Sequence, residues 1–346
     1  MSQLAEPGAR SKRVLGLALR LALSGALIGY LLSRLDRGEL WSAIADTQPA
    51  GWLLAVLLYL FSQITSGIRW ATLARPIGFR LGWLRFQQLY FEGMFFSLCL
   101  PSSIGGDLVK ALRLGGAGRG RILAACTVLA DRAAGLLAIV IIGLTALVER
   151  TYGLGLVRSL AIGVVLLAAT LIGTRIMFAL LNWPAGRIPD HHPIAHMLER
   201  LLPYHHHPYV FWNAIGWSMV VQGLNVLTVI ALGHALGLDL PAGAYCVAVP
   251  LVSLMTALPI SLNGVGVREG GLVWVLAPYG VSEAQGIALG LLWFSVTVAT
   301  GLIGGLVSLL GPPLDKQSEP STVDSIVEDD SGQAPLVATP DSGVSK

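Results

Sequence analysis

Long apolar segments limit the folds open to this chain of 346 residues. Each is close to the length at which a helix, rising about 1.5 Å per residue, crosses a hydrocarbon core of about 30 Å, and none has the alternation of barrel strands. The chain is 54% hydrophobic and only 12% charged, which excludes a soluble globular domain. We predict an all-α polytopic membrane protein with about six spanning helices: Val14–Leu32, Gly51–Trp70, Ile122–Leu147, Leu160–Leu181, Val210–Leu236 and Ala284–Leu310.

Two further apolar segments are interrupted by proline and glycine. The interruptions read LPSSIGGDLVK from Leu100 to Lys110 and LPISLNGVGVRE from Leu258 to Glu269. Proline lacks an N–H, and glycine permits conformations closed to other residues, so neither segment can be one continuous helix. At membrane depth the freed backbone groups must be buried in protein or line a polar cavity. The predicted structural breaks are Pro101, Gly105, Gly106, Pro259, Gly264 and Gly266.

Each interrupted segment is predicted to form a re-entrant helical hairpin. Residues 86–100 would reach only about 22 Å as a helix, which is short of a full crossing. Basic residues concentrate on the cytoplasmic side of membrane proteins. That rule places the amino terminus, the carboxyl terminus and the loop after Trp70 in the cytoplasm, with Trp70 as an interface anchor. The basic residues used are Arg10, Lys12, Arg13, Arg69, Arg75, Arg80 and Arg85.

On this count the two hairpins enter from opposite faces of a bacterial-type inner membrane and form an inverted repeat, an arrangement typical of transporters. The predicted transmembrane domain covers 14–311, with halves 14–181 and 209–311 joined by a cytoplasmic loop, 182–208. Residues 1–13 form a cytoplasmic amino terminus.

The tail 312–346 is expected to be disordered, because it is rich in Ser, Pro and acids and lacks apolar periodicity. It holds seven acids and two bases. Subtracting them from the totals of 20 acids and 23 bases leaves 13 acids and 21 bases, a net charge of +8 on the remainder. This surplus suits contact with anionic lipid headgroups.

Charged residues at the expected membrane depth are the candidate site, because a charge there costs a few kcal/mol on the lower estimates, about 2.5–3.5. We predict that substrate is bound by Asp107, Lys110, Arg113, Arg132, Arg268 and Glu269. Glu92 and Asp131 are candidate charge partners.

Asp107 admits two interpretations. It can cap the helix that follows and pair with Lys110 on the same face, which is a structural role. Alternatively, free N–H groups after Gly105-Gly106 bind a phosphate-bearing headgroup together with Lys110 and Arg113.

The other charges follow the same reasoning. Arg268 follows a Gly-x-Gly turn and offers a planar phosphate fork, whose charge Glu269 balances when the site is empty. Asp131 and Arg132 point about 100° apart on a helix. One arrangement has Asp131 facing Lys110 or Arg268, and Arg132 facing Glu92 or Glu269, but the sequence does not fix these pairs.

The sequence gives little support for nucleotide, metal or nucleophile chemistry. The sequence has no Walker loop, nucleotide fingerprint, nucleophile elbow or metal-ligand spacing. The histidines between 191 and 207 include adjacent residues that cannot easily converge on one ion. We expect no metal, no cofactor, no nucleic-acid partner and no enzyme activity; a membrane-embedded transferase is disfavoured because no set of acid, base and nucleophile is present.

The chain resembles the lysylphosphatidylglycerol synthase transmembrane-region family, also described as flippase-like membrane domains, over about Val14–Leu310. The resemblance implies a lipid-translocating domain, since relatives fused to an aminoacyltransferase are thought to flip the lipid that the fused domain makes. This chain shows no such domain, so synthase activity is not expected, and Lys110, where many relatives have Arg, leaves the headgroup preference open. The matching residues are Arg69-Trp70, LPSSIGGDLVKALRL (100–114), Asp131-Arg132-Ala-Ala-Gly and LPISLNGVGVREGG (258–271).

The predicted function is translocation of a phospholipid or a lipid-linked glycan precursor through a charged intramembrane cavity. The alternative is a membrane partner that transports nothing and holds or regulates a lipid synthase or glycosyltransferase.

Overall fold

The described part of the chain is helical. This computed structural model describes residues 37–99, 105–116, 120–153, 155, 158, 161–169, 172–173, 208–258, 261 and 263–310. Its principal helices are α2 (Arg37–Ala45), α3 (Pro49–Ala74), α4 (Trp83–Cys99), α5 (Gly105–Gly115), α6 (Gly120–Tyr152), α9 (Pro208–Ala235), α10 (Ala242–Ala257), α11 (Val267–Leu276) and α12 (Glu283–Leu310). Short 3-10 turns, η1 (Arg75–Ile77) and η2 (Ala277–Tyr279), follow α3 and α11. No strand occurs among these residues.

Four of the described helices, α3, α6, α9 and α12, are long and apolar enough to cross a membrane. They confirm four of the predicted spans, each with ends within about five residues. The predicted span Val14–Leu32 lies outside the described residues, and only 161–169 and 172–173 of Leu160–Leu181 are described. The protein is therefore a multi-pass membrane protein. Residues 1–13, nearly all of the loop 182–208 and the tail 312–346 also lie outside the described residues.

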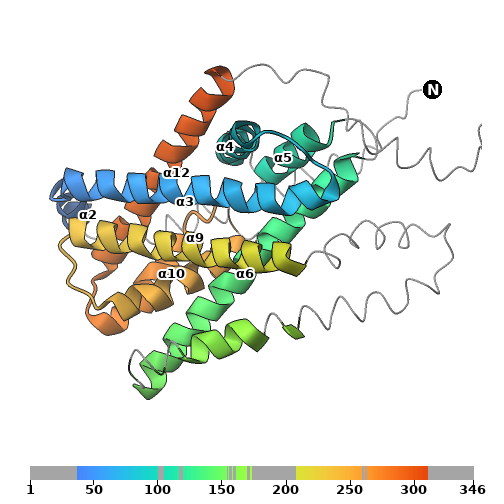
Figure 1. Cartoon of the computed structure of the whole chain (residues 1–346). Helices are drawn as coiled ribbons and strands as arrows, with labels where there is room; N and C mark the ends of the chain where they lie inside the picture. Colours follow the sequence, from blue (N-terminus) through green and yellow to red (C-terminus); the bar gives the residue numbers. More distant parts are fainter. Residues whose placement is uncertain are drawn as a thin grey trace, which may run out of the picture.

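The same order of elements occurs twice in the chain. A long helix, a short helix, a break, a short helix and a long helix follow one another from α3 to α6 and again from α9 to α12. Figure 1 shows α3 and α9 side by side and running in opposite directions. Helices α6 and α12 also run in roughly opposite directions. The long helices of the two units are thus oppositely oriented.

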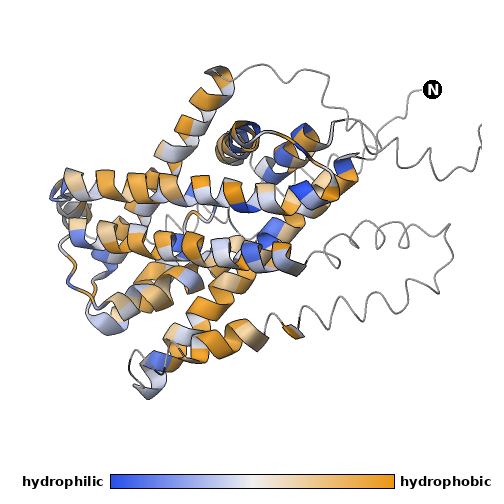
Figure 2. Cartoon of the chain, viewed as in Figure 1, coloured by the Kyte–Doolittle hydropathy of each residue, from blue (hydrophilic) through white to orange (hydrophobic). Residues whose placement is uncertain are grey.

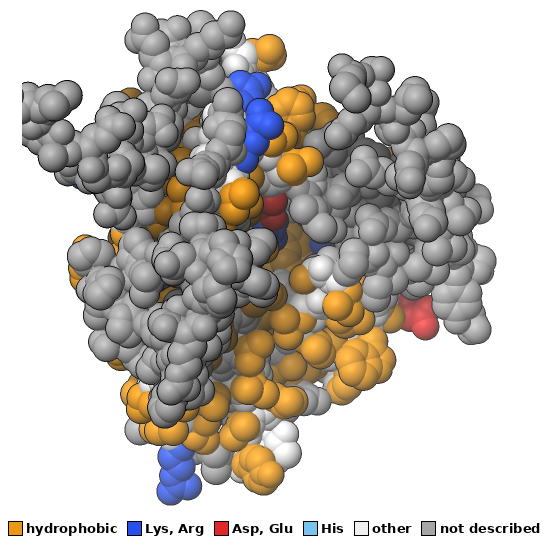
Figure 3. All heavy atoms as spheres, turned by 90° about the vertical axis from the view of Figure 1, so that its right-hand side faces the viewer, with side chains coloured by type: hydrophobic (Ala, Val, Ile, Leu, Met, Phe, Trp, Pro, Cys, Tyr) orange, Lys and Arg blue, Asp and Glu red, His pale blue; other side chains and the backbone are white. Residues whose placement is uncertain are grey.

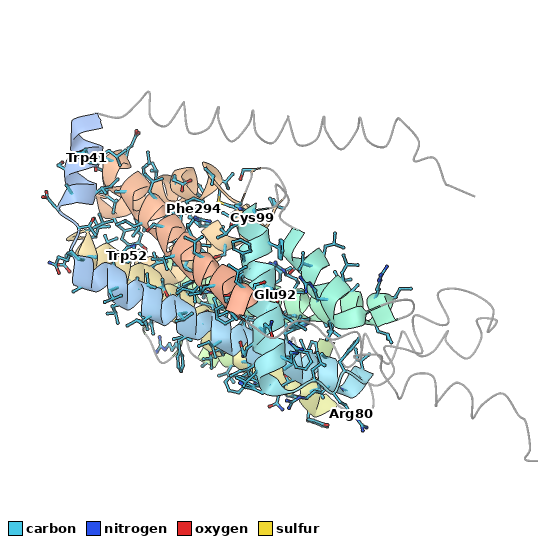
Figure 4. All side chains as sticks on the ribbon, turned by 90° about the horizontal axis from the view of Figure 1, so that it is seen from above. Trp41, Trp52, Arg80, Glu92, Cys99 and Phe294 are labelled. Carbon is cyan, nitrogen blue, oxygen red and sulfur yellow. The ribbon has the colours of Figure 1, made fainter. Side chains whose placement is uncertain are left out.

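Helix α4 lies across the long helices instead of along them. It is seen end-on in Figure 1, and Figure 4 shows it crossing the direction of α3. At 17 residues, it is also too short to be among the candidate spans. The chain next to the first break therefore does not form an ordinary spanning helix.

Glycines of α12 allow α4 to approach very closely. A Cβ on Gly304 would meet the backbone carbonyl of Phe91, and one on Gly301 would meet the side chain of Leu98. An added Cβ on Gly305 would lie 2.7 Å from Cδ2 of the Phe95 ring. Small residues permit this close approach of helices in membrane proteins.

Trp70 is buried, so the prediction of an interface anchor was wrong. Its side chain is 1% exposed and packs edge-on against Phe86, with ring centroids 5.5 Å apart. The indole N–H donates to Thr127 Oγ1 at 3.0 Å, which joins α3 to α6. The apolar window ended at Trp70, but α3 continues to Ala74, so the tryptophan lies a full turn inside the helix.

A buried ion pair joins three of the long helices. Arg69 Nε of α3 donates to Asp131 Oδ1 of α6 at 2.7 Å, and Arg69 Nη1 donates to Ser218 Oγ of α9 at 2.9 Å. Both charged side chains are less than a tenth exposed. Asp131 therefore faces neither Lys110 nor Arg268, which corrects the predicted pairing.

The breaks themselves are partly described. Gly264 and Gly266 have φ of 76° and 84°, and Asn263 has φ of 49°, so the chain turns through left-handed backbone before α11. Gly105 and Gly106 begin α5. Pro101 and Pro259 lie outside the described residues.

Asp131→Asn is expected to destabilise the protein, because it leaves the Arg69 guanidinium buried without a counter-charge. Breaking one side of a buried pair costs about 3–5 kcal/mol. Thermal denaturation of the purified protein in detergent should show a clearly lower melting temperature. Asp46→Asn, at an exposed turn residue, is the control and should change little. Equal melting of the two variants would contradict a structural role for the pair.

Candidate functional site

The first break brings together charges from α4, α5 and α6. Helix α5 begins at Gly105, so Asp107 lies in its first turn and not at the predicted N-cap. Lys110 Nζ lies 3.5 Å from Asp107 Oδ1, one turn further along the same face, which confirms the predicted pairing. A carboxylate in the first turn also interacts favourably with the helix dipole.

Asp107 is shared between two cations. Arg132 Nε of α6 donates to Asp107 Oδ2 at 2.7 Å, while Lys110 occupies the other carboxylate oxygen. The Asp107 side chain is 13% exposed, whereas that of Arg132 is 57% exposed. Arg132 contacts neither Glu92 nor Glu269, which corrects that arrangement. Helix α5 packs against α6 and places Asp107 beside Arg132.

A second ion pair extends the cluster toward α4. Arg113 Nε lies 3.8 Å from Glu92 Oε2, and Gln88 Nε2 donates to Glu92 Oε1 at 3.3 Å. Again the carboxylate is buried, at 3% exposure, and the guanidinium is exposed, at 43%. Glu92 is thus a charge partner, as predicted, and its partner is Arg113.

Lys110 is held in a narrow position between α4 and α5. Its ammonium lies 3.9 Å from the centroid of the Tyr90 ring, a cation–π contact. Its aliphatic stem lies against Gly93, where an added Cβ would come within 2.6 Å of Lys110 Cγ and Cε. Gly93 of α4 therefore provides the space that the lysine occupies.

The cluster as a whole presents positive charge. Three cations, Lys110, Arg113 and Arg132, face two carboxylates, Asp107 and Glu92, giving a net charge of +1. Figure 2 shows hydrophilic residues among hydrophobic ones where α4, α5 and α6 meet. In Figure 3, which faces the end where α3 finishes and α6 begins, acidic and basic side chains lie in a hollow bordered by hydrophobic ones. Because the carboxylates are buried and the guanidiniums exposed, the accessible groups are hydrogen-bond donors.

Arg132 also lies on an exposed apolar face of α6. Exposed positions recur along this helix at the three- and four-residue spacing of one face. Between Leu129 and Leu147, the large exposed side chains other than Arg132 are hydrophobic: Leu129, Leu136, Val140, Leu144 and Leu147. In this part of α6 a single guanidinium therefore interrupts an otherwise apolar surface.

The second break holds Arg268 and Glu269 in the first turn of α11. The Gly266 N–H donates to Glu269 Oε2 at 2.6 Å, which satisfies a donor at the helix start. Arg268 Nη2 donates to the Asn263 carbonyl at 3.1 Å. Both side chains are buried, and within the described residues neither forms an ion pair shorter than 4.0 Å.

The two breaks are in direct contact. Asn263 Nδ2 donates to the Ser97 carbonyl at 3.1 Å, which links the turn before α11 to the last turns of α4. Figure 4 labels Glu92 and Cys99 along α4 and Phe294 on the neighbouring α12. The predicted site residues thus form two groups, one at each break, and the breaks meet at this hydrogen bond.

Arg69 was missed as an intramembrane charge. It was counted with the cytoplasmic arginines because the apolar window ends beside it, but it lies within α3 and is 6% exposed. The signal available was the length of α3, since a helix continued to Ala74 leaves Arg69 more than one turn from its end. In the part of the chain that the structure describes, no three His, Cys, Asp or Glu side chains gather as a metal site.

Gly106→Ala is expected to destabilise the site, because the new Cβ would meet Ser97 Oγ and the Gly93 carbonyl and push α4 from α5. Such overpacking costs about 1–3 kcal/mol. Gly270→Ala is the matched control, since no atom lies within 4 Å of its added Cβ and alanine favours helix. Melting curves should therefore shift down for Gly106→Ala and stay level or rise for Gly270→Ala. A level curve for both would argue against close α4–α5 packing.

Comparison with protein families matches residues 17–305 to the family described as the lysylphosphatidylglycerol synthase TM region. The match includes both breaks, the whole charged cluster and all of the described helices up to the last turns of α12. A comparison with curated proteins finds none that matches. The chain therefore belongs to the lysylphosphatidylglycerol synthase TM region family.

Proposed function

We propose that this protein moves an anionic phospholipid, or a lipid-linked precursor with a phosphate-bearing headgroup, across the membrane. The headgroup binds at the cluster of Asp107, Lys110, Arg113 and Arg132, while the acyl chains stay in lipid along the exposed face of α6. No bond is made or broken, so no catalytic residue is part of the proposal. Membership of a membrane family named for a lipid synthase supports a lipid as the cargo.

The observation that supports this function best is the exposure of Arg132 on the apolar face of α6. Arg132 lies 12 residues after Gly120, about 18 Å along the helix. An exposed charge at such depth is costly and is usually functional. Its Nε is occupied by Asp107, but a guanidinium has five N–H donors in a planar fork, which leaves others for phosphate oxygens.

The arrangement of the helices supports alternating access. The two units, α3 to α6 and α9 to α12, have the same order of elements and opposite directions. We propose that α4–α5 and α10–α11 are re-entrant hairpins of an inverted repeat in a domain of six spans, with substrate bound where the repeats meet. Arg75, Arg80 and Arg85, near the loop between α3 and α4, favour a cytoplasmic position for that end. We place the protein in a bacterial inner membrane, with both termini cytoplasmic.

The test is a lipid-movement assay in liposomes with fluorescent phosphatidylglycerol, scored by how much of the label an impermeant quencher reaches over time. Wild-type protein should move the lipid. Arg132→Gln should slow movement about tenfold or more, because a hydrogen bond to a charged group contributes about 1.5–3 kcal/mol. Arg80→Gln, the same change at an exposed arginine outside the cluster, should leave the rate unchanged.

Size-exclusion chromatography would establish that all three proteins are folded. Failure of folded wild-type protein to move fluorescent phosphatidylglycerol or a lipid-linked sugar, with and without an ion gradient, would overturn the proposal. That outcome would favour the alternative of a partner that holds or regulates a lipid synthase or glycosyltransferase.

A further inference from the structure

We propose that Arg268 forms a second phosphate-binding site, separate from the cluster at the first break, and that the headgroup occupies it at a later stage of the same movement. This inference rests on the proposed function, but it concerns different residues and a different unit of the chain. Its ligand is a phosphate group, either that of a lipid or free phosphate.

The first evidence is an unsatisfied guanidinium. Arg268 is 91% buried, since its exposed fraction is 9%. Nη2 donates to the Asn263 carbonyl, whereas Nη1 is buried and has no hydrogen-bond partner in the described structure. Burying a donor on a charged group without a partner is costly, so an acceptor at Nη1 would stabilise the side chain.

The neighbouring carboxylate does not serve as this acceptor. Glu269 directs Oε2 to the Gly266 N–H at 2.6 Å, at the start of α11. Its Oε1 is also buried without a hydrogen-bond partner among the described residues, and no ion pair with Arg268 is formed. Glu269 therefore holds the helix start and leaves the guanidinium free for an external anion.

Aromatic rings restrict where that anion can bind. The guanidinium carbon lies 5.5 Å from the ring centroid of Trp293 and 5.3 Å from that of Phe294. These cation–π contacts hold the guanidinium and exclude water from part of its surface. The donor left for an anion is therefore Nη1, at the edge of the guanidinium plane.

Asn263 relates the second site to the first. Its carbonyl accepts a hydrogen bond from Arg268 Nη2, and its Nδ2 donates to the Ser97 carbonyl of α4. Helix α4 also carries Glu92 of the first cluster. The two sites are therefore joined through one residue of the second break.

The test measures binding in maltoside micelles, which contain no phosphate. Phosphatidylglycerol, inorganic phosphate and diacylglycerol are titrated separately, and tryptophan fluorescence is followed. Trp293→Phe identifies the part of the signal that comes from the ring beside Arg268. Wild-type protein should give a saturable Trp293-dependent change with phosphatidylglycerol and none with diacylglycerol. A response to inorganic phosphate as well would identify free phosphate as a ligand; its absence would assign the site to the lipid.

Variants decide the role of Arg268. Arg268→Gln should lower the apparent affinity at least tenfold, while Arg132→Gln and Arg80→Gln should keep the Trp293-dependent change. If Arg268→Gln does not fold, Arg268→Lys, which retains the charge and loses the fork, should still bind at least threefold more weakly. An unchanged affinity in the folded variant, or no Trp293-dependent change in wild-type protein, would overturn the second site.

The outcomes separate the two proposals. Arg268-dependent binding without lipid movement in liposomes would keep the site and reject the transport function. If lipid movement needs Arg132, and neither binding nor movement changes in Arg268→Gln, the transport function is kept and the second site is rejected.

Discussion

Lipid offers no hydrogen-bonding partner to a charged side chain, so charges within membrane helices must be satisfied by protein or by a polar ligand. In this protein the constraint has three different outcomes. Arg69 and Asp131 satisfy each other in the interior and hold α3, α6 and α9 together. Arg132 is satisfied on one side only, and Arg268 keeps a buried nitrogen with no partner among the described residues.

These three outcomes distinguish charges that only hold helices together from charges that keep free hydrogen-bond donors. A pair that is buried on both sides has no capacity for a ligand and stabilises helix packing. A pair whose carboxylate is buried and whose guanidinium is exposed keeps its position and still offers donors. The pairs Arg132–Asp107 and Arg113–Glu92 belong to the second kind.

The features predicted correctly from the sequence are those that depend on residues close together in the chain. Hydropathy located α3, α6, α9 and α12, because a spanning helix needs about 20 apolar residues in succession. The Asp107–Lys110 pair was predicted because helix geometry brings residues three apart together. The pairs Arg69–Asp131, Arg132–Asp107 and Arg113–Glu92 were not predicted, because each depends on how separate helices pack against one another. The contacts of Arg268 with Trp293 and Phe294 of α12 were not predicted for the same reason.

The glycine contacts of α12 bear on how the molecule can move. Gly304 lies against the backbone of Phe91 on α4, although the two belong to different halves of the chain, and α3 likewise lies beside α9. The two halves are therefore in direct contact. They cannot separate as two rigid bodies without breaking close backbone contacts. The long helices and α4 act instead as one frame.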